Sequence, residues 1–142
     1  MGERVIPAPE ATATPGDARA ARWIGLAGAK LGFLGVAAGA FGAHALKHQM
    51  VPAMLEVYDT AARYQIVHAL ALVLTALGVQ QRGLAPWRAA GWLFVIGTVL
   101  FSGSLYALSL TQRGMWGAVT PVGGVCLLVG WACLAIGWWR GR

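Results

Sequence analysis

Residues 23–43 read WIGLAGAKLGFLGVAAGAFGA, and this stretch decides the class of protein to which the chain belongs. A helix needs about 20 consecutive apolar residues to cross the hydrocarbon core of a bilayer. The stretch reaches that length with a single charged residue, Lys30. We therefore predict that residues 23–43 form a transmembrane helix.

Three further apolar stretches follow, at about residues 64–80, 90–110 and 118–139. Charged residues make up only 11% of the chain, whereas a soluble domain carries about 25%. The sequence therefore predicts an all-α membrane protein, with four transmembrane helices in one domain that covers residues 23–142.

Two segments outside these stretches have their own character. Residues 1–22 are rich in Ala, Pro and Thr and hold no large apolar cluster, so we predict a flexible N-terminal tail. Residues 51–63 place Leu55, Tyr58 and Ala62 on one side of a helix and charged residues on another. This pattern predicts a short interfacial amphipathic helix before the second span.

The distribution of Lys and Arg predicts how the chain is oriented. The N-terminal segment, the loop between the second and third spans and the C-terminus together carry seven basic residues, and the opposite side carries three. Cytoplasmic flanks hold the excess of Lys and Arg, and an even number of spans returns the chain to its starting side. We therefore expect both termini in the cytoplasm. The basic residues are scattered, which indicates membrane flanks and no nucleic-acid partner.

Glycines recur along the first span with a spacing of three and four residues. They are Gly25, Gly28, Gly32, Gly35, Gly39 and Gly42. This spacing puts them on one side of the helix, where the absence of side chains lets a neighbouring backbone approach closely. A sparser row, Gly123, Gly130 and Gly137, runs along the fourth span. The two rows are predicted helix-packing surfaces, and they could face each other or a second copy of the protein.

Lys30 interrupts the first span with a positive charge. None of the five acidic residues lies in a predicted span, so no carboxylate of this chain is expected beside it. A lysine inside the bilayer is costly unless it extends to the headgroups or pairs with an acid. We expect Lys30 to contact lipid phosphates or a carboxylate on a partner subunit.

A set of polar residues falls near the outer ends of the four spans. The set comprises His44, Arg63, Tyr64, Gln65, His68, Ser102, Ser104, Tyr106 and Thr120. Lipid offers polar groups no hydrogen bonds, so side chains at the same depth should partner one another. We expect one polar layer between the outer helix ends. It could be a structural hydrogen-bond network, a pocket for a small molecule, quinone or lipid, or a haem site with His44 and His68 as ligands.

Several motifs resemble a known family. They are GAFGAHAL at 39–46, RYQ at 63–65 followed by HALAL at 68–72, FSGSLY at 101–106, and TPVGG at 120–124. In this order they resemble the domain-of-unknown-function family numbered 423, which is similar to the eukaryotic transmembrane protein 256 group. The resemblance covers about residues 24–139. It implies a small multi-span membrane protein without an assigned activity, here in the bacterial plasma (inner) membrane.

No pattern typical of an enzyme or of a bound cofactor stands out. We find no nucleophile paired with a base, no metal-ligand cluster and no phosphate-binding loop in the sequence. We therefore expect a structural or accessory subunit of a larger membrane complex, in contact with lipid and with partner subunits or further copies of itself. The alternative is a protein that binds a small molecule, quinone or lipid in the outer polar layer.

Overall fold

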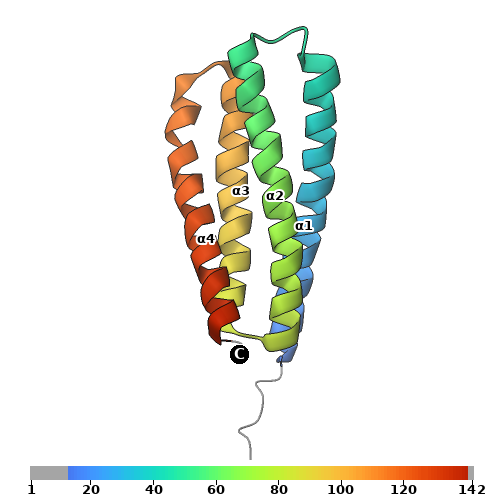
Figure 1. Cartoon of the computed structure of the whole chain (residues 1–142), viewed down its shortest axis with the longest axis vertical. Coiled ribbons are helices and arrows are strands. Elements are labelled where there is room, and N and C mark those ends of the chain that lie inside the picture. The colour runs from blue at the N-terminus through green and yellow to red at the C-terminus, as the bar shows by residue number, and fades with distance from the viewer. Residues whose placement is uncertain (1–12, 141–142) are drawn as a thin grey trace, which may run out of the picture.

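The computed structural model describes residues 13–140, and these form four long helices that run side by side along the length of the molecule (Figure 1). Helix α1 (Pro15–Phe41) continues into a turn of π-helix, η1 (Gly42–Leu46), and α2 spans Pro52–Arg82. Helix α3 spans Ala85–Thr111, and a short 3-10 helix, η2 (Gly114–Ala118), leads into α4 (Thr120–Arg140). All four are long and apolar enough to cross a membrane, which confirms the predicted fold class.

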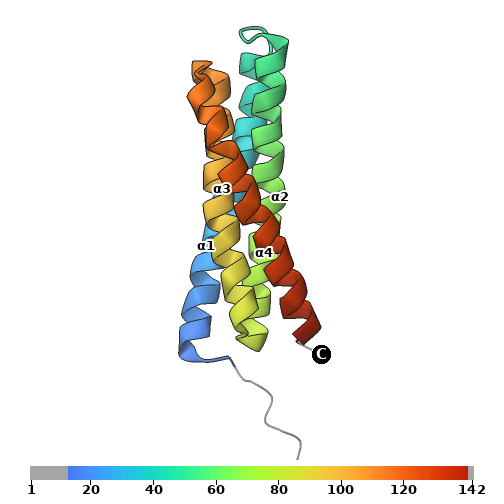
Figure 2. The same cartoon turned by 90° about the vertical axis from the view of Figure 1, so that its left-hand side faces the viewer.

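The helices pack mainly in chain order. α2 lies between α1 and α3, and α3 lies between α2 and α4. α1 also touches α3, while α4 leans across the other face of α3 (Figure 2). The first residues of α1 and the last residues of α4 lie at the same end of the molecule (Figure 1). Because α2 and α4 do not pack along each other, an opening between them faces the surroundings.

The start of α1 corrects one prediction. Thr14 caps the helix by accepting from the backbone N–H of Asp17, whose side chain in turn accepts from the backbone N–H of Thr14, and Pro15 follows at the first helical position. This reciprocal arrangement satisfies two backbone donors at a helix end. Residues 15–22, expected in the flexible tail, are therefore helical. The rest of the expected tail, residues 1–12, lies outside the described part of the chain.

The segment before the second span is also part of a longer element. Residues 52–63 are the first turns of α2, which continues without interruption to Arg82. At 1.5 Å per residue α2 is about 46 Å long, longer than the ~30 Å hydrocarbon core of a bilayer. The predicted amphipathic residues therefore form one end of the spanning helix, where α2 extends beyond the core.

The glycine row of α1 packs against α2. A Cβ atom on Gly28 would lie 2.9 Å from the carbonyl oxygen of Ala69, and one on Gly35 would lie 2.8 Å from Cγ1 of Ile66. A Cβ on Gly42 would lie 2.9 Å from the ring of Tyr58. These three glycines, seven residues apart, are thus the points where the row lies closest to α2. The intervening glycines are less confined, and Gly39 has nothing within 4 Å of the same position.

The glycine row of α4 packs against α3. A Cβ on Gly123 would lie 2.4 Å from the backbone nitrogen of Phe101, and one on Gly130 would lie 2.8 Å from the ring of Phe94. Gly137 gives the same close approach to the indole of Trp87. Each row therefore packs on a neighbouring helix of the same chain, and the two rows do not face each other.

Candidate functional site

The polar residues expected in one outer layer are divided among several places. His44 is exposed in η1, and its neighbour Gly42 lies against Tyr58 of α2. Tyr58 is ten positions before His68, or about 15 Å away along the helix axis. The expected pairing of His44 with His68 is therefore incorrect, and these two side chains do not approach a common haem iron.

Three other members of the set tie neighbouring helices together. The hydroxyls of Ser104 and Thr120 hydrogen-bond at 2.8 Å and join α3 to α4. The amide Nε2 of Gln65 donates to the backbone carbonyl of Leu31 at 2.8 Å and joins α2 to α1. Both contacts are part-buried and satisfy polar groups between neighbouring helices.

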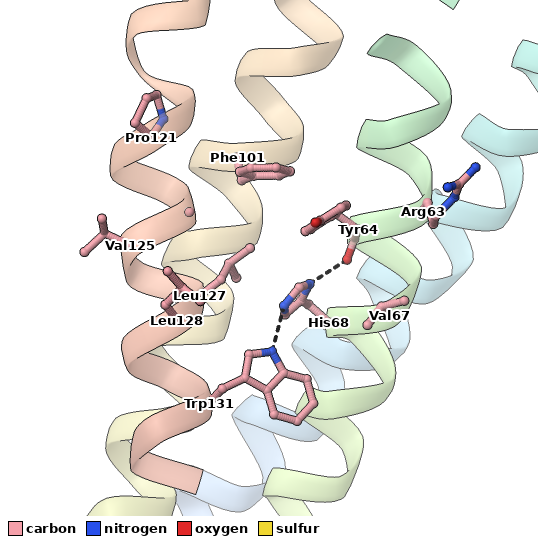
Figure 3. Close-up of a pocket in the computed structure, with 11 residues that line it drawn as sticks. Arg63, Tyr64, Val67, His68, Phe101, Pro121, Val125, Leu127, Leu128 and Trp131 are labelled. Atoms are coloured by element: carbon pink, nitrogen blue, oxygen red, sulfur yellow. Dashed lines mark hydrogen bonds between the residues drawn. The ribbon is translucent and has the colours of Figure 1, made fainter. Parts of the chain in front are cut away.

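His68 is the centre of a second group, in which it links α2 to α4 (Figure 3). Its Nδ1 lies 2.8 Å from the carbonyl oxygen of Tyr64, and its Nε2 lies 3.1 Å from the indole Nε1 of Trp131. A carbonyl can only accept and an indole N–H can only donate. His68 is therefore the neutral tautomer with the proton on Nδ1. Both ring nitrogens are used, so the side chain acts as a bridge between the helices.

Aromatic rings surround this bridge. Tyr64 stacks on His68 with ring centroids 5.9 Å apart, and Phe94 lies 5.6 Å from the same imidazole. Phe94 also meets Trp131 edge to face at 5.2 Å, and Tyr64 packs on Phe101 at 4.6 Å. Aromatic pairs of this kind hold ring orientations as well as burying area. The aromatic group therefore sets the spacing between α2 and α4.

A groove of about 570 Å³ lies above the bridge, between α2 and α4, with α3 behind it. This volume is within the ~300–1,000 Å³ range of ligand pockets. The lining is mostly apolar and includes Val67, Phe101, Val125 and Leu128. Leu128 is 72% exposed, so the groove opens sideways between the two helices. In a bilayer this opening faces lipid.

The position of the groove along the helices also differs from the expected outer layer. His68 is 16 residues after the start of α2 and 14 before its end, so it lies near the middle of the helix. Trp131 lies near the middle of α4 in the same way. The groove runs from these two residues towards Arg63 and Pro121. It thus extends from the middle of the two helices towards the end of the molecule that carries η1 and η2.

Polar groups without an internal partner gather at the rim of the groove. The phenol of Tyr64 reaches from α2 towards Phe101, and the side chain of Arg63 extends from α2 away from α4 (Figure 3). Arg63 is the one charged residue among those that line the groove. Within residues 13–140 it forms no ion pair. The groove therefore has an apolar interior and a polar, positively charged rim.

Lys30 lies away from this groove on the exposed side of α1. Glycines two residues before and after it, Gly28 and Gly32, both lie against Ala69, so Lys30 is at about the depth of His68. It forms no ion pair within the described residues. The structure does not bring Lys30 to any of the other predicted site residues.

Asp17 was assigned to the tail from the sequence, yet it closes one end of the molecule. Its carboxylate is buried, accepts from the hydroxyl of Thr14 and forms an ion pair with Arg88 in the first turn of α3. Arg88 also donates to the carbonyl of Gly83 between α2 and α3. The signal for this contact was present in the sequence, since Thr-Pro-Gly-Asp at 14–17 is typical of a capped helix start.

Trp131 is the hydrogen-bonding residue of the groove that sequence analysis did not identify. Tryptophan is enriched at the two membrane interfaces, and a tryptophan in the middle of a span is therefore unusual. That position could have marked Trp131 as a residue with an internal hydrogen-bond partner. Gly124 and Leu127, which also line the groove, carry no comparable signal, because apolar and glycine residues are common throughout α4.

Comparison with known proteins agrees with this architecture. The family described as "Protein of unknown function (DUF423)" matches residues 38–124. The UPF0382 membrane protein YwdK of Bacillus subtilis is 45% identical over 103 residues, which cover 72% of this chain and 84% of the relative. The UPF0382 inner membrane protein YgdD of Escherichia coli K12 is 45% identical over 98 residues, 68% of this chain and 74% of the relative. No solved structure matches. The chain is a membrane protein and belongs to the DUF423 family.

Proposed function

We propose that the protein binds a membrane lipid or a lipid-like small molecule, such as a long-chain quinone, in the groove between α2 and α4. The observation that carries this proposal is the shape and position of the groove. It is an apolar groove that opens sideways, with its closed end at His68 and Trp131 and its polar rim at Arg63 and Tyr64, about one turn further along α2. An amphipathic molecule in one leaflet of a bilayer has the same distribution of polarity.

The hydrogen bonding of His68 supports an apolar ligand at the closed end. Both of its ring nitrogens are already bonded, to the carbonyl of Tyr64 and to Trp131. A buried polar ligand group at this depth would need one of those bonds to break, which costs free energy. The part of the ligand that reaches His68 is therefore a hydrocarbon chain.

The rim supports a polar head on the same ligand. The hydroxyl of Tyr64 and the guanidinium of Arg63 can both donate there, and neither is used in an internal bond within residues 13–140. Arg63 lines the groove, but its side chain extends from α2 away from α4 (Figure 3), so it would meet a headgroup that reaches past the edge of the groove. A phospholipid and a quinone share this arrangement of chain and acceptor oxygens.

A groove-filling variant tests the proposal. Gly124 lines the groove, and a Cβ there would meet only the ring of Phe101 at 3.8 Å, an ordinary contact. Gly124→Phe should therefore fold and occupy the groove. Gly103→Phe on α3 is the matched control, because nothing lies within 4 Å of its Cβ position and it does not line the groove.

The measurement is native mass spectrometry of delipidated protein titrated separately with a phospholipid and with a long-chain quinone. We expect one molecule of at least one ligand to bind the wild type and Gly103→Phe, and Gly124→Phe to lose that binding. The ligand that binds distinguishes the two sources. Equal binding by all three proteins would overturn the proposal.

A second candidate function, an accessory subunit of a larger membrane complex, is favoured by Lys30. Its charge lies on the exposed side of α1 at about the level of His68, without an ion pair in the described chain. A carboxylate on a partner subunit would offset the cost of that charge. Lys30→Leu should then release a partner that co-purifies with the wild type in mild detergent. An unchanged set of co-purifying proteins would remove this candidate.

We also propose that the protein resides in the bacterial inner membrane with both termini in the cytoplasm. The same-side termini of an even number of helices and the excess of basic residues on that side support this orientation. In this orientation the rim of the groove faces the outer leaflet. The ligand would therefore be drawn from the outer leaflet of the bilayer.

A further inference from the structure

Three hydroxyls form a buried row on α3. Thr98 is 1% exposed and Ser102 is 2% exposed, and the hydroxyl oxygen of Tyr106 is also inaccessible. The three residues are spaced by four, so they lie on one side of the helix. None of these oxygens has a hydrogen-bond partner within residues 13–140.

Other hydroxyls in the same helices behave differently. Thr75 donates to the carbonyl of Ala71 at 2.7 Å, and Ser109 donates to the carbonyl of Tyr106 at 3.0 Å. Ser and Thr in helices commonly satisfy themselves in this way. Thr98 and Ser102 are placed in equivalent helical surroundings, yet their hydroxyls do not use their own helix. Their orientation therefore indicates a partner outside the α3 backbone.

We propose that ordered water molecules bind this row and bridge its three hydroxyls. Residues one helical turn apart are separated by about 6 Å along the axis. This distance is too long for a direct hydrogen bond, and one water with two bonds of about 2.8 Å falls short of it, but two hydrogen-bonded waters in a row span it. Buried waters satisfy otherwise unpaired polar groups in this manner. The site takes water as its ligand, independently of any molecule in the α2–α4 groove.

The neighbouring helix α2 buries only small side chains between its aromatic contacts with this part of α3. Tyr106 packs edge to face on Tyr58 of α2 at 4.9 Å, and the next aromatic contact between the two helices joins Tyr64 to Phe101. Between these two contacts the buried residues of α2 are alanines, Ala61 and Ala62. Their small side chains lie at the depth of Ser102. The row therefore has one aromatic contact at its Tyr106 end and a second beside Ser102, with only alanines buried on α2 between the two.

Paired substitutions test the proposal. Thr98→Val and Ser102→Ala remove a hydroxyl with little change in shape, and the matched controls Thr75→Val and Ser109→Ala remove one that is satisfied within its own helix. If water bridges the row, each test variant should lower the melting temperature by a few degrees, and by more than its control. The double variant Thr98→Val/Ser102→Ala should lose less than the sum, because both hydroxyls bind shared water.

The contrary result is a melting temperature that does not fall when the hydroxyl is removed. A dry, unpaired hydroxyl destabilises the protein, so its removal would leave the melting temperature unchanged or raise it. That outcome for both test variants would overturn the proposal.

If the variants do not fold, brief X-ray radiolysis of the wild type in ¹⁸O-labelled water decides the question. We expect the label on Tyr106 but not on Phe94, which is fully buried among aromatic rings. Equal protection of both residues would also overturn the proposal.

Discussion

Replacing single glycines of α1 by alanine should change stability according to the contact that each glycine makes with α2. Gly28 and Gly39 lie in the same helix, but their surroundings differ. A Cβ on Gly28 would be 2.9 Å from both the carbonyl oxygen of Ala69 and Cβ of Leu72, whereas a Cβ on Gly39 would meet nothing within 4 Å. The same substitution therefore tests the helix contact separately from helix propensity.

The expected magnitudes follow from two opposing effects. Alanine is favoured over glycine in a helix interior by about 1 kcal/mol, and this gain applies at both positions. Overpacking a close contact costs about 1–3 kcal/mol, and this cost applies only to Gly28, where a backbone oxygen has to move. We expect the free energy of unfolding of Gly28→Ala to be about 1–3 kcal/mol below that of Gly39→Ala.

Reversible unfolding in mixed micelles with increasing SDS, followed by circular dichroism, gives the two free energies. Gly32→Ala serves as an intermediate case, since its Cβ would lie at an ordinary 3.6 Å from that of Ala69. Equal stability of Gly28→Ala and Gly39→Ala would refute the close packing of α1 on α2.

Three further predictions concern the ends of the helices and the closed end of the groove. A cysteine at Gln49 should react with an impermeant thiol reagent in intact cells and one at Gln81 should not, after background labelling of the native cysteines is subtracted; the reverse pattern would contradict cytoplasmic termini. Asp17→Asn and Arg88→Gln should each lower the melting temperature. The double variant should lower it by less than the sum of the two single decreases, because the two side chains form one ion pair. Strictly additive decreases would show that the two residues are not coupled. Trp131→Phe should lower the free energy of unfolding by about 1 kcal/mol, since it removes the donor to the histidine of α2; unchanged stability would argue against that hydrogen bond.

The four spans could be predicted from the sequence because each is a long apolar run, and a bilayer imposes a minimum length on such runs. The helix ends were harder to place. α2 begins at Pro52, well before the apolar run that starts near Tyr64, because helical structure continues beyond the hydrocarbon core. At α1 we placed residues 14–17 in the tail because of the composition of the surrounding residues, although their sequence is typical of a helix cap.

The candidate site could be predicted only in part, because depth within one helix does not give the register between helices. Tyr64 and His68 lie one turn apart and share a face of α2, which helical periodicity alone gives. Whether His44 meets His68 depends on how far α1 slides along α2, which is set by close contacts such as Gly28 with Ala69. Likewise, the bond between His68 and Trp131 depends on how α4 crosses α3. No local pattern encodes these offsets.

Photocrosslinking in native membranes tests ligand binding in the groove most directly. A benzophenone amino acid would replace Leu128, which lines the groove, or Leu74, an exposed α2 residue outside it. We predict that position 128 captures predominantly one lipid-like molecule, identified by mass spectrometry, and that added Gly124→Phe abolishes this capture. Position 74 should capture bulk phospholipids in proportion to their abundance. The same bulk mixture at both positions, unaffected by Gly124→Phe, would contradict a specific site between α2 and α4.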